Sequence, residues 1–94
     1  MQSHAIYKVP QGKLLKISLE YNEHKNTITE VKIMGDFFAY PEESVEVLEK
    51  KLVHTVLEQE SLMNVIRTIV EEHHIEFIGL DADGLVHGIL MCRS

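Results

Sequence analysis

Histidine and cysteine are the residue types in this chain that most readily bind metal ions or act as nucleophiles. The sequence contains six histidines and one cysteine. His73 and His74 are adjacent and cannot share one face of a helix or strand, and the other histidines are widely scattered. The spacings that support a tetrahedral zinc site, Cys-x-x-Cys and His-Glu-x-x-His, do not occur. The sequence therefore predicts no metal site, and we interpret the histidines as ordinary surface or partly buried side chains.

The segment Asp81-Ala82-Asp83-Gly84 begins like a calcium-binding loop. Such a loop needs a further oxygen ligand at its fifth position and a glutamate at its twelfth, where this chain has Leu85 and Cys92. We therefore interpret the segment as a turn or a helix cap.

Cys92 is a candidate nucleophile or sulfur acceptor. Reactive thiols need a stabilised thiolate, usually at a helix start or beside a cation. Cys92 lies two residues from the end of the sequence, next to Arg93, and we interpret it as a bystander. Since no cluster of histidine, cysteine and acidic residues forms a complete catalytic site, we expect no catalytic residue in this chain.

Two other segments are less easily explained by folding alone. In the first, Lys8 and Lys13 lie on either side of a turn that contains proline and Gly12, directly before the main strand. In the second, Phe37 and Phe38 follow a strand and a Gly-Asp pair. Solvated lysines around a loop, and an aspartate that accepts local backbone hydrogen bonds, are the simplest interpretations. Two consecutive phenylalanines cannot easily both point inward, so we expect one ring to face a partner.

Alternating apolar and polar residues predict the strands that position these segments. Residues 13–22 and 27–35 each alternate with a period of two, and a short polar stretch separates them. Such a pattern is typical of an antiparallel hairpin of half-buried strands. In the second strand, Thr29 and Val31 alternate with Glu30 and Lys32. A short strand over residues 4–9, ended by Pro10, completes the predicted sheet.

Helical periodicity follows the sheet. Pro41 suits the first helical position, and the spacing predicts a helix over residues 41–52. Ser61 offers a cap for a second helix over 61–73, which carries a broad apolar stripe. Residues 76–90 fit either a hairpin with an Asp-Gly turn or a third helix, over 82–92, capped by Asp81. The residues alone leave both alternatives open.

Length and charge limit the class of protein. Ninety-four residues make one domain, 1–94, and no apolar run approaches the ~20 residues that span a bilayer. Fifteen acidic against nine basic residues give a formal charge of −6, which disfavours binding to nucleic acid. A single cysteine fits a reducing compartment. We expect a cytoplasmic protein with no membrane and no nucleic-acid partner.

The two unexplained segments carry a family resemblance. Lys8-Val9-Pro10-Gln11-Gly12-Lys13-Leu14-Leu15, the hairpin, and Ile33-Met34-Gly35-Asp36-Phe37-Phe38-Ala39-Tyr40-Pro41-Glu42-Glu43 resemble the carboxy-terminal accessory domain of lipoate–protein ligase. A chain of this length resembles that domain as the separately encoded small subunit of an archaeal two-part ligase. The resemblance is strong from Lys8 to Leu52 and looser afterwards. One departure is Gln11, where the family often has a second glycine, and this alters the flexibility of the turn.

The resemblance implies a fold, an activity and a partner. The fold is α+β and SufE/NifU-like, with a small antiparallel sheet of two to three strands packed against about three helices, which favours the third helix over the hairpin. The activity is ATP-dependent attachment of lipoate to lipoyl domains of 2-oxoacid dehydrogenase complexes and to the glycine cleavage H protein, through lipoyl-AMP. The catalytic subunit, expected to form a heterodimer with this chain, holds lipoate, ATP and magnesium, so this chain binds no cofactor and has no activity alone. The accessory part is required for adenylation and dispensable for transfer.

The resemblance also directs attention to particular residues. Lys13, with Gly12 and Lys8, is the candidate for active-site support. The candidate partner interface consists of Asp36, Phe37, Phe38 and Tyr40. Two alternatives are a sulfur-acceptor or iron–sulfur scaffold protein, which needs a reactive Cys92, and a generic protein-interaction module.

Overall fold

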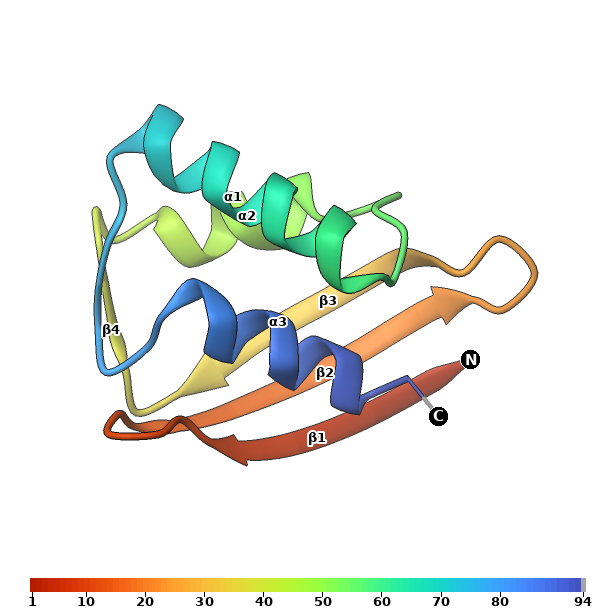
Figure 1. The fold of residues 1–94 in the computed structure, drawn as a ribbon, viewed down its shortest axis with the longest axis horizontal. Helices are drawn as coiled ribbons and strands as arrows, with labels where there is room; N and C mark the ends of the chain where they lie inside the picture. The colour runs from red at the N-terminus through yellow and green to blue at the C-terminus, as the bar shows by residue number, and fades with distance from the viewer. Residues whose placement is uncertain (94) are drawn as a thin grey trace.

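The two alternating segments of the sequence fold into a long antiparallel hairpin. In this computed structural model, which describes residues 1–93, its strands are β2 (Leu14–Asn22) and β3 (Thr27–Gly35). The side chain of Asn22 closes the turn, because it accepts hydrogen bonds from the N–H groups of His24 and Lys25 at 2.9 and 3.0 Å. β1 (Gln2–Lys8) pairs with the other side of β2, which gives a three-stranded sheet of order β1-β2-β3 (Figure 1).

A β-bulge changes the orientation of side chains near this turn. The register shifts between Glu20 and Tyr21, so Thr29 of β3 has no residue opposite it. Ile28 consequently points into the core, with 0% of its surface exposed, whereas Thr29 is exposed. The sequence pattern predicts that Thr29 and Val31 share one face of β3, and this prediction is wrong for Thr29.

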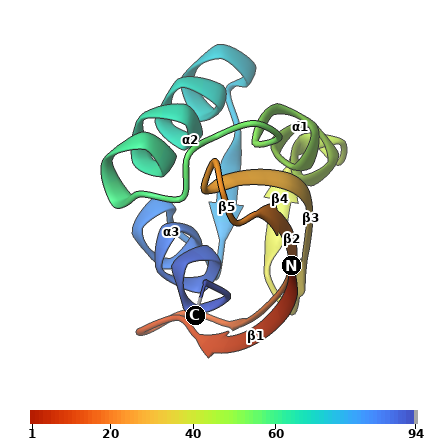
Figure 2. The ribbon, with the colours of Figure 1, turned by 90° about the vertical axis from the view of Figure 1, so that its right-hand side faces the viewer.

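Three helices in the described part of the chain cover one face of the sheet (Figures 1 and 2). α1 (Ser44–Lys51) packs on β3, α3 (Ala82–Met91) packs on β1 and β2, and α2 (Gln59–His73) contacts both other helices. The core between the layers contains fully buried leucines and isoleucines from the sheet and all three helices, among them Leu15, Leu19, Leu48, Leu62, Ile66, Leu85 and Ile89. The predicted α+β class, a small antiparallel sheet packed against about three helices, is confirmed.

The first helix begins later than the sequence suggests. Pro41 is not its first residue, because the Pro41 carbonyl accepts a hydrogen bond from the Ser44 N–H at 2.9 Å and forms a separate turn. The Tyr40–Pro41 peptide bond is cis. Helical geometry starts at Ser44, so Glu46 is the acidic residue of the first turn. The acidic side chain still lies at the positive end of the helix dipole.

The second helix begins earlier than predicted. Ser61 is not its cap, since the Glu58 carbonyl already accepts the first helical hydrogen bond, from the Leu62 N–H at 2.9 Å. The helix ends at His74, which adopts a left-handed conformation with φ of 52°. None of the helices described is long and apolar enough to cross a membrane.

The tail of the chain contains one short strand and the third helix. β5 (Glu76–Ile78) pairs antiparallel with β4 (Phe38–Tyr40), and the two form a separate two-stranded ribbon at one end of the molecule (Figure 1). Asp81 caps α3, because its Oδ1 accepts a hydrogen bond from the Gly84 N–H at 2.6 Å. The structure therefore resolves the ambiguity of this region in favour of the helix.

Candidate functional site

The loop from Val9 to Lys13 has a defined shape. The Val9 N–H donates to the Lys13 carbonyl at 3.1 Å, and the Gly12 N–H donates to the Val9 carbonyl at 2.8 Å. The Lys13 N–H donates to the carbonyl of Gly79, which directly follows β5, at 2.8 Å. The loop is thereby fastened to the β4–β5 ribbon, although more than sixty residues separate them along the chain.

The structure assigns Lys8 and Gly12 to closure of this loop. The Lys8 Nζ donates hydrogen bonds to the carbonyls of Gly12 and Val9, at 2.5 and 3.2 Å. A Cβ atom on Gly12 would lie 2.7 Å from the Gly79 oxygen, so no larger side chain fits there. Gln11 has a φ of 58°, a conformation that glycine adopts most easily. A glycine at position 11 would adopt this conformation without strain.

Lys13 is exposed, as Lys8 is, but its stem packs against a distant part of the chain. A Cβ atom on Gly79 would lie 2.4 Å from Lys13 Cγ, so the lysine stem rests against the glycine backbone. Gly79 also has a φ of +85°, which disfavours any other residue. The contact holds the stem while the ammonium group remains in solvent. The pairing of Lys13 with Gly79 depends on the tertiary fold and is not predictable from the sequence pattern.

The outer face of the β4–β5 ribbon carries three large apolar side chains. Phe38 lies opposite Ile78, and Tyr40 follows on the same side of β4. Phe38 is 61% exposed, and Tyr40 and Ile78 are each 50% exposed. We call these three residues the ribbon patch. A patch of this kind on a small protein is typical of a contact site for another protein.

The other predicted interface residues lie differently. Phe37 is half-buried and packs against the core, so the two neighbouring rings do point in different directions. Asp36 is exposed, and its backbone N–H donates to the Leu14 carbonyl at 3.0 Å. Ile78 was not among the sequence candidates. Its strand is too short to show a period of two, and only the pairing with Phe38 reveals its place.

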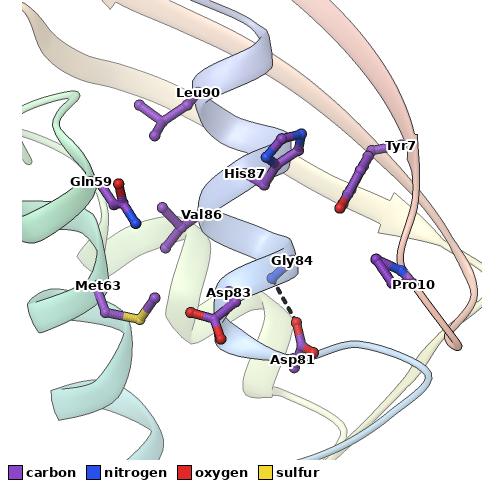
Figure 3. A pocket seen from close by; sticks show the side chains of 10 residues that line it. All are labelled: Tyr7, Pro10, Gln59, Met63, Asp81, Asp83, Gly84, Val86, His87 and Leu90. Carbon is purple, nitrogen blue, oxygen red and sulfur yellow. Dashed lines mark hydrogen bonds between the residues drawn. The ribbon is translucent and has the colours of Figure 1, made fainter.

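A cavity of about 390 Å³ opens between α2, the start of α3 and the end of β1 (Figure 3). Asp81 and Asp83 line it, and the ring of Tyr7 faces that of His87 with 4.4 Å between their centroids. Among its described lining residues there is no lysine or arginine. Two carboxylates without a strong cation make the cavity a poor site for the phosphates of a nucleotide.

Cys92 has the properties of a structural thiol. It is completely buried, and its one S–H group is shared as a weak donor between the carbonyls of Ile17 and Gly88, with Sγ–O distances of 3.7 and 3.6 Å. Burial raises the pKa of the Cys92 thiol to about 11. A thiol that is neutral and inaccessible at pH 7 cannot accept sulfur or attack a substrate. Residues 1–93 also contain no group of three potential metal ligands.

The fold as a whole matches that of a chain in a solved structure. The matching chain belongs to an archaeal lipoylation system, described as a bi-partite lipoate protein ligase and its E2 lipoyl domain from Thermoplasma acidophilum. The TM-score is 0.81 at 24% sequence identity, and the match covers 95% of this chain and 94% of the other. The class of protein is therefore a small α+β domain with the fold of that chain. No curated protein sequence matches this chain.

The family is established by the sequence itself. The sequence model described as "Bacterial lipoate protein ligase C-terminus" matches residues 11–87. These residues include the end of the Val9–Lys13 loop, the hairpin and the whole β4–β5 ribbon. The chain belongs to this lipoate protein ligase C-terminal family, and the resemblance found in the sequence is confirmed.

Proposed function

We propose that this chain is the accessory subunit of a two-part lipoate–protein ligase and enables the catalytic subunit to activate lipoate. The match of the ligase C-terminal family to residues 11–87 carries the proposal. The similar fold of a chain from a bi-partite ligase system supports it. The buried thiol of Cys92 argues against the alternative of a sulfur carrier.

The reaction has two steps, and we assign this chain to the first. In that step the lipoate carboxylate attacks the α-phosphorus of ATP, which forms lipoyl-AMP and releases pyrophosphate. In the second step the amine of a lipoyl-domain lysine attacks the acyl carbon and releases AMP. Only the first step develops charge on a triphosphate, which magnesium, cations and backbone donors must stabilise.

The binding of ATP, magnesium and lipoate belongs to the catalytic subunit in this proposal. The carboxylates around the cavity near Asp81 and Asp83 support this division, since they repel phosphate. The lipoyl domains of 2-oxoacid dehydrogenase complexes and the glycine cleavage H protein then contact the accessory chain only indirectly. We propose a cytoplasmic heterodimer, a location that the free thiol of Cys92 fits.

The ribbon patch and Lys13 supply the contacts in this proposal. Phe38, Tyr40 and Ile78 dock on the catalytic subunit, and the docking orders loops around its active site. Lys13 lies beside the ribbon, since its backbone and stem contact Gly79. We propose that its exposed ammonium group reaches toward the docked subunit. Ordering of these loops is the main contribution of this chain to lipoate activation. The positive charge of Lys13 contributes directly at the active site.

Reconstitution tests the proposal. The catalytic subunit from the same organism is incubated with lipoate, ATP, magnesium and a lipoyl domain, with and without this chain, and modification is followed by mass spectrometry. We expect lipoylation only when both subunits are present. Equal lipoylation by the catalytic subunit alone, or lipoylation by this chain alone, would contradict the proposal.

A further inference from the structure

The strand β1 leaves a row of backbone groups open at the edge of the sheet. The Tyr21 N–H donates to the Met1 carbonyl at 2.9 Å, and the Val9 N–H donates to the Lys13 carbonyl at 3.1 Å. In an antiparallel pair, every second residue forms backbone hydrogen bonds with the neighbouring strand. The backbone N–H and C=O groups of the residues in between point away from that strand. The outward-pointing N–H and C=O groups therefore belong to Gln2, His4, Ile6 and Lys8.

Nothing in the described part of the chain covers this edge. β1 is the outermost strand, and the helices lie above the face of the sheet rather than beside β1 (Figures 1 and 2). Within residues 1–93, no hydrogen bond is formed by the backbone N–H groups of these four residues. Alternate side chains of β1 are also exposed, including Ile6 at 64%.

The opposite edge of the same sheet is partly covered by other segments of the chain. On β3, the Ile33 N–H donates to the Glu49 carboxylate at 2.7 Å. Nearer the turn, the Ile28 N–H donates to the Thr55 carbonyl at 3.0 Å, and the Ile28 carbonyl accepts from the His54 N–H at 2.7 Å. Native proteins commonly protect sheet edges in such ways, because an open edge pairs with other strands. β1 is therefore the more open of the two edges of the sheet.

The chemistry of the edge defines its occupant. Evenly spaced N–H and C=O groups are satisfied together only by an extended segment that adds a strand. Ile6 lies in one cross-strand row with Lys16 and the half-exposed Met34, and Lys8 follows on the same face. Glu20, which carries a carboxylate, lies opposite Gln2 at the other end of β1. An added strand with apolar and acidic side chains complements this apolar and cationic end.

A second copy of the chain is the less suitable occupant. Each copy carries a formal charge of −6, so two copies repel each other before short contacts form. The open strand also leads from Lys8 directly into the Val9–Lys13 loop, which lies against the ribbon proposed as the docking surface. A strand supplied by the docked subunit would continue that contact along the sheet.

We propose that the catalytic subunit of the ligase adds an extended segment to the β1 edge and extends the three-stranded sheet. This inference rests on the proposed function, since it uses the same partner. It adds a main-chain recognition mode to the side-chain contacts of the ribbon patch. Main-chain pairing would set the orientation of the two subunits, and the patch would supply apolar contact area.

Amide hydrogen exchange resolved to single residues tests the inference. In the free chain, the amides of Ser3, Ala5 and Tyr7 are protected by β2, and those of His4 and Ile6 exchange fast. On addition of the catalytic subunit, we expect protection of His4 and Ile6 to rise by at least about tenfold. Unchanged exchange at these amides in the complex would overturn the inference. The same rise in the free chain at high concentration would assign the edge to a second copy instead.

Proline substitution provides an independent measurement. His4→Pro removes an outward N–H that the sheet itself does not use, so the fold tolerates it as edge strands do. We expect His4→Pro to weaken binding of the catalytic subunit by about tenfold, and the matched His4→Ala to change it less than about twofold. Equal binding by a folded His4→Pro variant would overturn the inference, and the exchange measurement decides if the variant does not fold. If the unaltered chain binds no catalytic subunit, the proposed function itself is wrong.

Discussion

Two lysines that look alike in the sequence have different roles in the structure. The Lys8 ammonium group donates hydrogen bonds to two carbonyls of its own loop, whereas Lys13 projects into solvent beside Gly79. We predict that Lys13→Ala lowers the rate of lipoyl-AMP formation by the mixed subunits by about tenfold or more, because a cation near the triphosphate is lost. The affinity between the subunits, measured by titration calorimetry, should stay the same. An unchanged rate would exclude a direct role for Lys13.

Substitutions of Phe37 and Phe38 should affect different properties of the chain, its stability and its binding to the catalytic subunit. Phe38 is 61% exposed, so Phe38→Ala should change the free energy of unfolding by less than about 0.5 kcal/mol. It should weaken binding of the catalytic subunit by more than about tenfold, since exposed aromatic rings are frequent anchors of interfaces. Phe37 packs on the core, and Phe37→Ala should lower the free energy of unfolding by about 1–3 kcal/mol. Denaturation and binding curves for both variants check this, and tight binding by Phe38→Ala would remove the ribbon patch from the interface.

The buried thiol makes stability depend on pH in the alkaline range. The pKa of Cys92 is raised from 9.0 to about 11 in the folded chain. Between these values the unfolded chain loses the thiol proton first, so stability is complete below about pH 9 and falls as pH rises toward 11. The expected loss from this group is about 2–3 kcal/mol.

Cys92→Ala is the control for this dependence, because tyrosines and lysines titrate in the same range. The difference in unfolding free energy between the natural chain and the variant should shrink from pH 9 to pH 11. A difference that is independent of pH would contradict the assigned burial. Thiol reagents should also label Cys92 only when the chain unfolds, and rapid labelling of the folded chain would reopen the sulfur-carrier alternative.

At the scale of elements, the cap of α3 is the feature that decides the conformation of the tail. Asp81 Oδ1 accepts a hydrogen bond from the Gly84 N–H. We predict that Asp81→Ala lowers the free energy of unfolding by about 1 kcal/mol, and that Asp81→Asn retains most of the stability because it keeps an acceptor. Asp83→Ala is the matched control, since Asp83 is exposed in the same turn and interacts mainly with the helix dipole. A larger effect at Asp83 in chemical denaturation would contradict the role of the cap.

Long elements were predictable from the sequence, and short or tertiary features were not. The hairpin of residues 14–35 follows from nine-residue strands that repeat one pattern. The ribbon strands contain three residues each, too few to show a period. The starts of α1 and α2 were misplaced because Pro41 and Ser61 are suitable terminal residues, but the backbone hydrogen bonds to Pro41 and Glu58 place the helix starts elsewhere. Among the candidate site residues, Lys13 and Phe38 could be identified from the sequence. Gly79 and Ile78 could not, because only their contacts with Lys13 and Phe38 in the folded chain place them at the site.

At the scale of the whole molecule, the exposed contact features gather at one side of the fold. The Val9–Lys13 loop and the β4–β5 ribbon share one end, and the open edge of β1 runs from that end along the sheet (Figure 1). The buried thiol and the carboxylate-lined cavity offer no nucleophile or phosphate site of their own. These candidate docking surfaces, on a domain of the lipoate protein ligase C-terminal family, are consistent with the proposed role as one part of a divided ligase.

The most direct measurement compares the two half-reactions. The catalytic subunit is assayed for lipoyl-AMP formation from lipoate and ATP, and separately for transfer of lipoyl from preformed lipoyl-AMP to a lipoyl domain, each with and without this chain. We predict that adenylation falls to background without this chain and that transfer proceeds at a similar rate in both cases. Adenylation that does not depend on this chain, or a dependence confined to transfer, would contradict it.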